Sequence, residues 1–219
     1  MSNKIKLFIC DDYALFRDGI SAILRDETTI EIVGQAENGR LGVEAILRLK
    51  PDVALMDISM PELNGFEATL RIKQADPAIK ILILTMYDEE ELIARCLDAG
   101  ASGYVIKDVP AAQLVYAIQT VYKGGEYLSP GVAKKVVSQY VKGGKRQETS
   151  YDLLTGRERE VLKLLADGFS SKEIASNLRL SIKTVDVHKY NLMRKLDLHD
   201  RSDIIKYAIQ NKLIMLSTM

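Results

Sequence analysis

The chain of 219 residues contains no tryptophan and only two cysteines, Cys10 and Cys96. Two cysteines cannot build a disulfide framework, and without CxxC spacing they do not suggest zinc, so each is expected to be a small buried hydrophobe. No apolar run approaches the roughly 20 residues of a membrane-spanning helix, and the N-terminus shows no signal-peptide core. We therefore expect a cytoplasmic protein with no membrane partner.

Neither sign of charge dominates the chain, because 30 Lys and Arg balance 30 Asp and Glu. The balance hides an asymmetry: residues 1–140 carry 15 basic and 20 acidic side chains, whereas residues 141–219 carry 15 basic and 10 acidic ones. A hydrophobic content of 47% is sufficient for packed cores and excludes wholesale disorder. An acidic half joined to a basic half suggests two domains with different partners, the second a candidate for nucleic acid.

Residues 1–124 alternate short apolar runs with amphipathic stretches. The apolar runs predict strands at 5–10, 30–36, 53–56, 81–84 and 103–106. The amphipathic stretches predict helices near 14–25, 39–49, 64–75, 89–98 and 110–123. Five βα units in a row predict an α/β domain with a five-stranded parallel sheet covered by helices on both faces.

The rest of the chain is predicted to be helical after a polar connection. Residues 125–150 read as a linker with a short helix near 130–141 and the glycine-bearing segment VKGGKRQETS. Beyond it, Thr155 with Glu158 and Ser170 with Glu173 fit the capping-box pattern, each before an apolar-periodic run. Further helices are predicted near 156–166, 170–178, 181–195 and 200–213. They make residues 151–219 a small all-helical domain.

Polar side chains follow four of the five predicted strands. In chain order they are Asp11 and Asp12, then Asp57, Thr85 and Lys107. Because ligands of an open parallel sheet bind outside the carboxyl ends of its strands, these groups are expected to converge. Three carboxylates favour a cation, and oxygen-only ligands suit Mg²⁺, while a lysine and a hydroxyl can hold phosphoryl oxygens. A single acid at a strand end is commonly a helix N-cap, but five matching positions indicate a phosphoryl site.

Four segments resemble the receiver domain of two-component response regulators: CDD (10–12), MDISMPELNG (56–65), LTMYD (84–88) and GYVIKD (103–108). The resemblance covers about residues 4–123 and implies a flavodoxin-like, doubly wound fold. It implies that Asp57 accepts a phosphoryl group from a sensor histidine kinase. Mg²⁺ is implied to be held by Asp12, Asp57 and the carbonyl of Ser59, with Asp11 acting through water, and Lys107 is implied to pair with the phosphoryl oxygens.

The same resemblance implies a conformational switch next to the phosphoacceptor. Thr85 is implied to move towards the new phosphoryl group, and the ring of Tyr104 to rotate inward behind it. Such a change is a two-state packing event biased by a local charge. Composition alone would make Tyr104 an ordinary half-buried aromatic residue on a strand.

The helices near 170–178 and 181–195 are joined by a tight turn around Leu180 and Ser181, the arrangement of a helix-turn-helix. At about 100° per residue, the second helix has one mostly apolar face. That face consists of Val185, His188, Leu192 and Leu196. The opposite face consists of Lys183, Val187, Tyr190 and Arg194, flanked by Asp186 and Asn191. Such groups contact phosphates and base edges, although a charged face is by itself usually only solvated.

Residues 153–198 are similar to LuxR-type helix-turn-helix domains of the NarL/FixJ subfamily through LT-x-RE-x-EVL, KEIA, S-x-KTV-x-x-H and M-x-KL. The resemblance implies that six residues contact DNA: Lys172, Lys183, Thr184, Val187, Asn191 and Arg194. Glu173 is implied to tie helices together, and His188 to be packed. Gly156 departs from the family by replacing the usual proline at the first helical position. Asp186 replaces a basic groove contact and would either accept from cytosine N4 or reject phosphate.

Together the resemblances predict a phosphorylation-controlled, DNA-binding transcription regulator. The chain is not expected to be an enzyme beyond catalysing its own aspartyl phosphorylation and dephosphorylation. Its expected partners are a sensor histidine kinase, a double-stranded DNA operator with inverted-repeat half-sites, a second copy of the chain, and RNA polymerase as a further candidate. Phosphorylation is expected to favour a homodimer through helices 13–26 and 110–123 or through helix 200–213, the latter being favoured on DNA.

Three other functions fit the residues less well. An aspartate-nucleophile phosphatase would have a second acid two residues after Asp57, where Ser59 stands. A regulator that senses a small molecule would need an apolar ligand pocket in the first half, which the acidic residues disfavour. A phosphorylation-independent regulator would usually have lost an acid or the lysine, and although none is missing, this alternative stays open.

Overall fold

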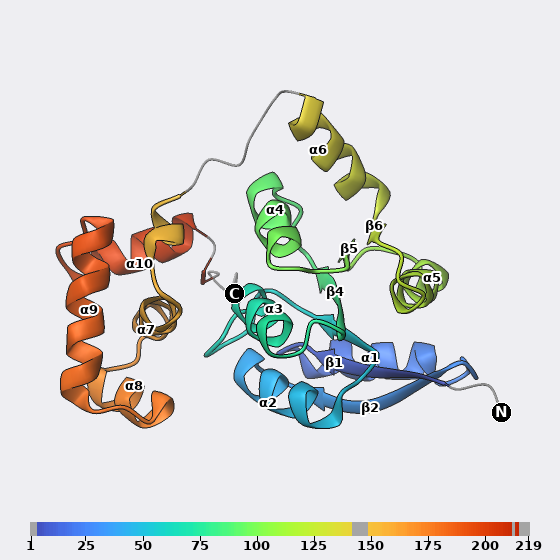
Figure 1. Ribbon diagram of the computed structural model, residues 1–219, viewed down its shortest axis with the longest axis horizontal. Coiled ribbons are helices and arrows are strands. Elements are labelled where there is room, and N and C mark those ends of the chain that lie inside the picture. Colours follow the sequence, from blue (N-terminus) through green and yellow to red (C-terminus); the bar gives the residue numbers. More distant parts are fainter. Residues whose placement is uncertain (1–3, 142–148, 212, 215–219) are drawn as a thin grey trace. The chain divides into compact units, whose positions relative to one another are not determined.

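The computed structural model describes residues 4–141, 149–211 and 213–214 (Figure 1). Most of the predicted linker segment VKGGKRQETS, residues 142–148, lies outside the described residues, as does residue 212 of the predicted last helix. The chain divides into two compact units, Met1–Arg146 and Gln147–Met219. Among the described residues, no helix combines the length and the apolar character needed to cross a membrane.

The first unit contains a parallel sheet in the order β2-β1-β3-β4-β5-β6. Its strands are β1 Ile5–Cys10, β2 Ile30–Ala36, β3 Val53–Met56, β4 Lys80–Thr85, β5 Gly103–Ile106 and β6 Tyr127–Leu128. The predicted α/β class and its five strands are confirmed. The sheet nevertheless has a sixth strand, because the two residues of β6, inside the predicted linker, pair with Gly103 and Tyr104 of β5.

Helices α1 and α5 share one hydrophobic cluster with residues of the sheet, including Leu7, Leu55 and Leu82. The helices of this unit are α1 Ala14–Leu24, α2 Gly39–Leu49, α3 Gly65–Ala75, α4 Glu90–Asp98, α5 Ala111–Tyr122 and α6 Pro130–Val141. Neighbouring contacts run from α2 to α3, from α3 to α4 and from α4 to α6. The strand order reverses between β1 and β3, which is where a doubly wound sheet opens a binding crevice.

Close backbone packing and side-chain caps fix the helices that begin beside this crevice. Asn38 accepts a hydrogen bond from Leu41 N at the start of α2, and Asn64 accepts one from Glu67 N at the start of α3. A Cβ atom at Gly65 would lie 1.9 Å from the carbonyl oxygen of Asp57, so only glycine allows α3 to begin this close to β3.

The second unit is all-helical, as predicted. A short 3₁₀ turn, Ser150–Leu153, which the sequence patterns did not indicate, precedes α7 Gly156–Ala166, α8 Ser171–Leu178, α9 Ile182–Leu196 and α10 Arg201–Gln210. Both predicted capping boxes are confirmed at the starts of α7 and α8. The core contains Val161, Ile174, Val185, Leu192 and Ile204, none more than 1% exposed.

Candidate functional site

Three carboxylates gather at the carboxyl ends of β1 and β3. Asp11, Asp12 and Asp57 each offer an oxygen, and these oxygens all lie within 4.8 Å of one another. Asp11 and Asp57 are buried, whereas Asp12 is exposed. A group of oxygen-only ligands at this spacing, with one member open to solvent, fits a hard divalent cation that keeps some of its water.

Lys107, at the end of β5, bridges two of the acids. Its Nζ lies 2.7 Å from Asp11 Oδ2 and 3.3 Å from Asp57 Oδ1. The same ammonium lies 4.4 Å from the centre of the Phe16 ring, and only 10% of the side chain is exposed. The amine is therefore held beside the Asp57 carboxylate, where it can donate to an anionic group attached there.

The electrostatics of the pocket favour the arrival of positive charge. Burial, together with the neighbouring Asp11 carboxylate, raises the pKa of Asp57 to about 6, although Lys107 opposes the shift. Burial and the Asp11 carboxylate also raise the pKa of Asp12. A divalent cation between these groups would stabilise their ionised forms and reverse both shifts.

Thr85 and Tyr104 lie on the two strands beyond β3. The hydroxyl of Thr85 is buried and has no partner at full hydrogen-bond geometry within the described part of the chain, but it faces the Asp57 carboxylate closely enough to lower the pKa of that group. Tyr104 is fully buried rather than half-buried, and its hydroxyl donates a 2.9 Å hydrogen bond to the carbonyl of Tyr87. Burial raises the pKa of the Tyr104 phenol, so it stays protonated and remains a donor.

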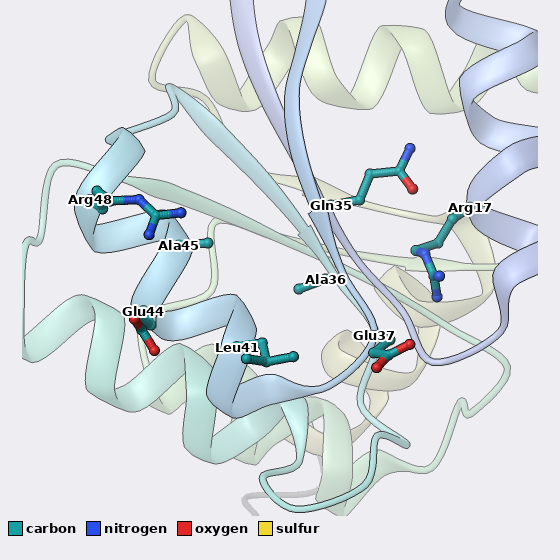
Figure 2. A pocket seen from close by; sticks show the side chains of 8 residues that line it. All are labelled: Arg17, Gln35, Ala36, Glu37, Leu41, Glu44, Ala45 and Arg48. Carbon is teal, nitrogen blue, oxygen red and sulfur yellow. The ribbon is translucent and has the colours of Figure 1, made fainter.

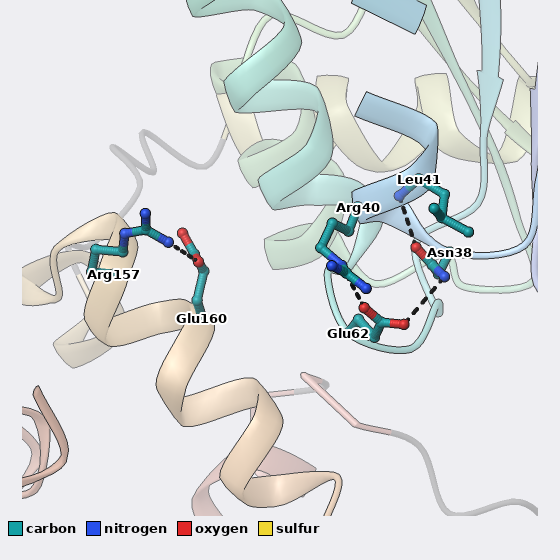
Figure 3. Close-up of polar contacts among 6 residues, drawn as sticks. All are labelled: Asn38, Arg40, Leu41, Glu62, Arg157 and Glu160. Atoms are coloured by element: carbon teal, nitrogen blue, oxygen red, sulfur yellow. Dashed lines mark hydrogen bonds and ion pairs between the residues drawn. The ribbon is translucent and has the colours of Figure 1, made fainter. Parts of the chain in front are cut away.

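The loop that carries Ser59 is held by hydrogen bonds that the sequence patterns did not reveal. Glu62 adopts a φ of 62°, in the left-handed region that a non-glycine residue seldom occupies. Its carboxylate accepts a 2.6 Å hydrogen bond from Arg40 Nε and a 3.3 Å hydrogen bond from Asn38 Nδ2 (Figure 3). These bonds tie the loop after Asp57 to the start of α2 and compensate for the backbone strain. The sequence shows the glutamate but neither its left-handed backbone nor its hydrogen-bond partners.

A separate depression of about 390 Å³ lies between α1, β2 and α2 (Figure 2). Its lining residues are Arg17, Gln35, Ala36, Glu37, Leu41, Glu44, Ala45 and Arg48. Arg17 also donates to the backbone carbonyl of Asp11, at 2.6 Å. The charges of the lining balance, because it contains two arginines and two glutamates. The lining therefore does not define one class of ligand.

In the second unit, the faces of α9 are divided as the periodicity predicts. Val185 and Leu192 are fully buried, and His188 is half-buried. The six residues proposed to face DNA lie on α8 and α9: Lys172, Lys183, Val187 and Arg194 are exposed, and Thr184 and Asn191 are half-buried. The hydroxyl of Thr184 lies 2.7 Å from Ser181 Oγ at the N-cap of α9.

Glu173 was predicted to tie helices together, but the glutamate that joins α7 to α9 is Glu158. The Glu173 carboxylate accepts hydrogen bonds of 2.8 and 2.7 Å from the amide and the hydroxyl of Ser170, the N-cap of its own helix. Glu158 Oε2 instead accepts 2.7 and 2.8 Å hydrogen bonds from Lys195 Nζ on α9 and from Thr155 N. Glu173 is therefore structural within α8, and Glu158 joins α7 to α9.

A doubly wound parallel sheet with an acidic pocket and a lysine, followed by a helix-turn-helix domain, defines the class of phosphorylation-controlled regulators. Residues 7–119 match the response regulator receiver domain, and residues 152–208 match the luxR family of bacterial regulatory proteins. The chain therefore belongs to the response regulators with a LuxR-type DNA-binding domain. It is a response regulator transcription factor with its receiver site at Asp11, Asp12 and Asp57.

Similar proteins extend over the whole chain. The oxygen regulatory protein NreC of Staphylococcus haemolyticus is 40% identical over 215 residues, which cover 96% of this chain and 99% of the relative. The NreC of Staphylococcus carnosus is 39% identical with the same coverage. A LuxR-family response regulator from Aurantimonas sp. SI85-9A1 is 30% identical with a TM-score of 0.61, covering 64% of this chain and 99% of that one.

A structure of two RcsB dimers bound to two parallel DNAs is also similar. It is 28% identical with a TM-score of 0.58, and the match covers 94% of this chain and 98% of that one. The acidic site is of the type that binds Mg²⁺ in receivers, and a receiver domain implies a histidine kinase as partner.

Proposed function

We propose that Asp57 accepts a phosphoryl group from a sensor histidine kinase and that this event controls transcription. The observation that carries the proposal is the position of Lys107 Nζ, 3.3 Å from Asp57 Oδ1 and 2.7 Å from Asp11 Oδ2. Asp12, Asp57 and the Ser59 carbonyl would hold Mg²⁺ directly, with Asp11 acting through water. The cation would supply neutralisation of the negative charge that collects in the pocket.

The reaction at Asp57 is the transfer of a phosphoryl group to a carboxylate. A carboxylate oxygen of Asp57 attacks phosphorus, the bond from phosphorus to the kinase histidine breaks, and the freed imidazole keeps the electron pair. Lys107 donates to the equatorial oxygens of the transferred group, over which the negative charge is spread in the transition state. Burial of Asp57 excludes bulk water from the acyl phosphate that results.

We assign the response to Thr85 and Tyr104. The buried Thr85 hydroxyl faces Asp57 without a partner at full hydrogen-bond geometry within the described residues, so it is a donor available to a phosphoryl oxygen on Asp57. When Thr85 moves towards that oxygen, it vacates space that the Tyr104 ring fills. The inward ring and its hydrogen bond to Tyr87 describe the state that phosphorylation would favour.

We assign DNA binding to residues 151–219, phosphorylation to residues 1–124, and their connection to residues 125–150. Lys172 would contact phosphate, and Lys183, Thr184, Val187, Asn191 and Arg194 would face the major groove from α9. A phosphorylated homodimer would place two such helices on half-sites of an inverted repeat, and RNA polymerase would be a further partner. The RcsB dimers on DNA support this arrangement. Kinase and operator are both reached in the cytoplasm, where we place the protein.

The acceptor assignment is tested by labelling the full chain with radiolabelled acetyl phosphate in the presence of Mg²⁺. Asp57→Asn should abolish the label while circular dichroism stays unchanged. Asp108→Asn, which alters an exposed carboxylate beside Lys107, is the matched control and should be labelled like the wild type. Continued labelling of Asp57→Asn at a single site would refute the assignment.

The dimer assignment is tested by light scattering with Mg²⁺, before and after addition of beryllofluoride, which stands in for the phosphoryl group on Asp57. A change from monomer to dimer supports control by phosphorylation. An unchanged molar mass would contradict the dimer assignment and would favour the phosphorylation-independent alternative.

A further inference from the structure

Lys135 joins helix α6 to the loop between β4 and α4. Its Nζ donates a 2.6 Å hydrogen bond to the backbone carbonyl of Asp88 and lies 2.5 Å from Asp88 Oδ2. Helix α6 packs against α4 in the first unit, as Figure 1 shows, and its Val132 is fully buried. Because one acceptor is a backbone carbonyl, this contact fixes the course of the loop as well as pairing two charges.

The residue before Asp88 in this loop is held by Tyr104. The Tyr104 hydroxyl donates to the Tyr87 carbonyl at 2.9 Å, and the Tyr104 carbonyl accepts a 3.0 Å hydrogen bond from Ser129 N. Ser129 directly precedes α6, and its own carbonyl accepts from Ala133 N in the first turn of that helix. Tyr104 therefore contacts the loop through its hydroxyl and the start of α6 through its backbone.

These contacts form a closed ring. From Tyr104 the ring passes through Tyr87 to Asp88, through Lys135 into α6, and through Ser129 back to Tyr104. The ring contains the residue assigned to the phosphorylation switch and the helix that precedes the connection to the second unit. An exposed ion pair alone would add little stability, but this pair is linked through the loop to the part-buried hydrogen bond between the Tyr104 hydroxyl and the Tyr87 carbonyl.

We propose that Lys135 is a positioning residue that couples the phosphorylation pocket to α6, an inference that rests on the proposed roles of Asp57, Thr85 and Tyr104. With Tyr104 inward, the Tyr87 carbonyl is fixed and the Asp88 carbonyl lies within reach of Lys135. When the Tyr104 side chain rotates outward, the Tyr87 carbonyl loses its donor and the loop is free to shift. Helix α6 then loses its Lys135 contact with the loop. Phosphorylation therefore favours one of two conformations of the loop between β4 and α4, and in this conformation α6 stays packed against α4.

Hydrogen exchange measured by mass spectrometry on the full chain tests this coupling. With Mg²⁺ present, beryllofluoride should slow amide exchange in α6 of the wild type about threefold or more. Lys135→Met should lose this slowing, and Lys135→Arg should retain most of it. Lys134→Met, which removes an exposed ammonium one residue earlier, is the matched control and should behave like the wild type. Asp88→Ala keeps the backbone acceptor and should lose the slowing only in part.

Coupling is reciprocal, so a second readout follows from the same variants. Lys135→Met should raise the beryllofluoride concentration at half-saturation by about two- to fivefold, whereas Lys134→Met should not. A role confined to the stability of α6 would leave this midpoint unchanged and would overturn the proposal.

The outcomes separate the coupling from the function on which it rests. If beryllofluoride slows exchange around Asp57 and Lys107 but α6 responds equally in the wild type and in Lys135→Met, the coupling is refuted and the phosphorylation site stands. An equal loss in Lys134→Met and Lys135→Met refutes the specific role of Lys135. If no peptide near Asp57 responds in the wild type, both proposals fail together.

Discussion

The hydroxyl of Ser171, the first residue of α8, donates a 2.9 Å hydrogen bond to Oδ1 of Asp186 on α9. The bond joins the two helices of the helix-turn-helix at their exposed side. It gives Asp186, the acid that replaces a basic groove contact, a partner within its own chain. The carboxylate therefore helps to position α8 against α9, and its negative charge still faces the surface assigned to DNA.

Replacing this charge should change DNA affinity more than stability. Asp186→Asn keeps an oxygen acceptor for Ser171 and removes repulsion towards phosphate, so affinity for non-specific duplex DNA should rise about two- to fivefold at moderate salt. Fluorescence anisotropy measures the affinity. Asp197→Asn, at the far end of α9, is the control and should show little change. A fall in affinity with Asp186→Asn would show that the acid contacts the DNA favourably.

Lys183→Ala should weaken binding to an operator obtained by in vitro selection about tenfold, because a groove contact from an exposed lysine is lost. Its melting temperature should match that of the wild type, since the Lys183 side chain is exposed. Lys206→Ala removes an exposed lysine of α10 and serves as the control. Equal affinity of Lys183→Ala and wild type would mean that α9 does not face the groove as assigned.

Glu158 should make the stability of the second unit depend on pH. Burial alone would raise its pKa, but hydrogen bonds from Lys195 and Thr155 outweigh burial and lower it. Because the folded pKa lies below the unfolded value, the ionised group stabilises the fold at neutral pH, and this stability is lost as pH falls below about 4.3 towards the folded pKa.

Denaturant unfolding of Glu158→Gln measures this contribution. At neutral pH the variant should lose about 1–3 kcal/mol, and the difference from wild type should shrink in acid. Lys195→Met and the double variant complete a thermodynamic cycle that isolates the pair. A loss independent of pH would assign the effect to packing rather than to the charge.

Gly156→Pro should stabilise the second unit by about 0.4–1 kcal/mol. Gly156 is the first residue of α7, a Cβ there meets no atom within 4 Å, and Thr155 before it has the extended conformation that proline requires. Thermal unfolding compares it with Gly156→Ala, which should gain less. A lower melting temperature would show that the fold needs the Gly156 amide as a donor or the backbone freedom of glycine at this position.

The acidic pocket could be predicted because each of its residues directly follows a buried strand, and parallel topology then brings the strand ends together. Burial of Tyr104 and the bond between its hydroxyl and Tyr87 could not be predicted, since they depend on a loop conformation. The two residues of β6 are too few to show an alternating pattern. The left-handed backbone of Glu62 is likewise hidden, because its compensation comes from Arg40 and Asn38, more than 20 positions away.

The short pairing of β6 with β5 also determines where the receiver can be separated from the rest of the chain. A fragment ending at residue 124, the predicted boundary, would remove the strand on one side of β5 and leave the carbonyls of Ser102 and Tyr104 without the amides of Tyr127 and Ser129 that donate to them. Uncovered edge strands recruit strands from other molecules, so that fragment would be prone to self-association unrelated to phosphorylation. A fragment that continues through Val141 retains both β6 and α6 as a cover.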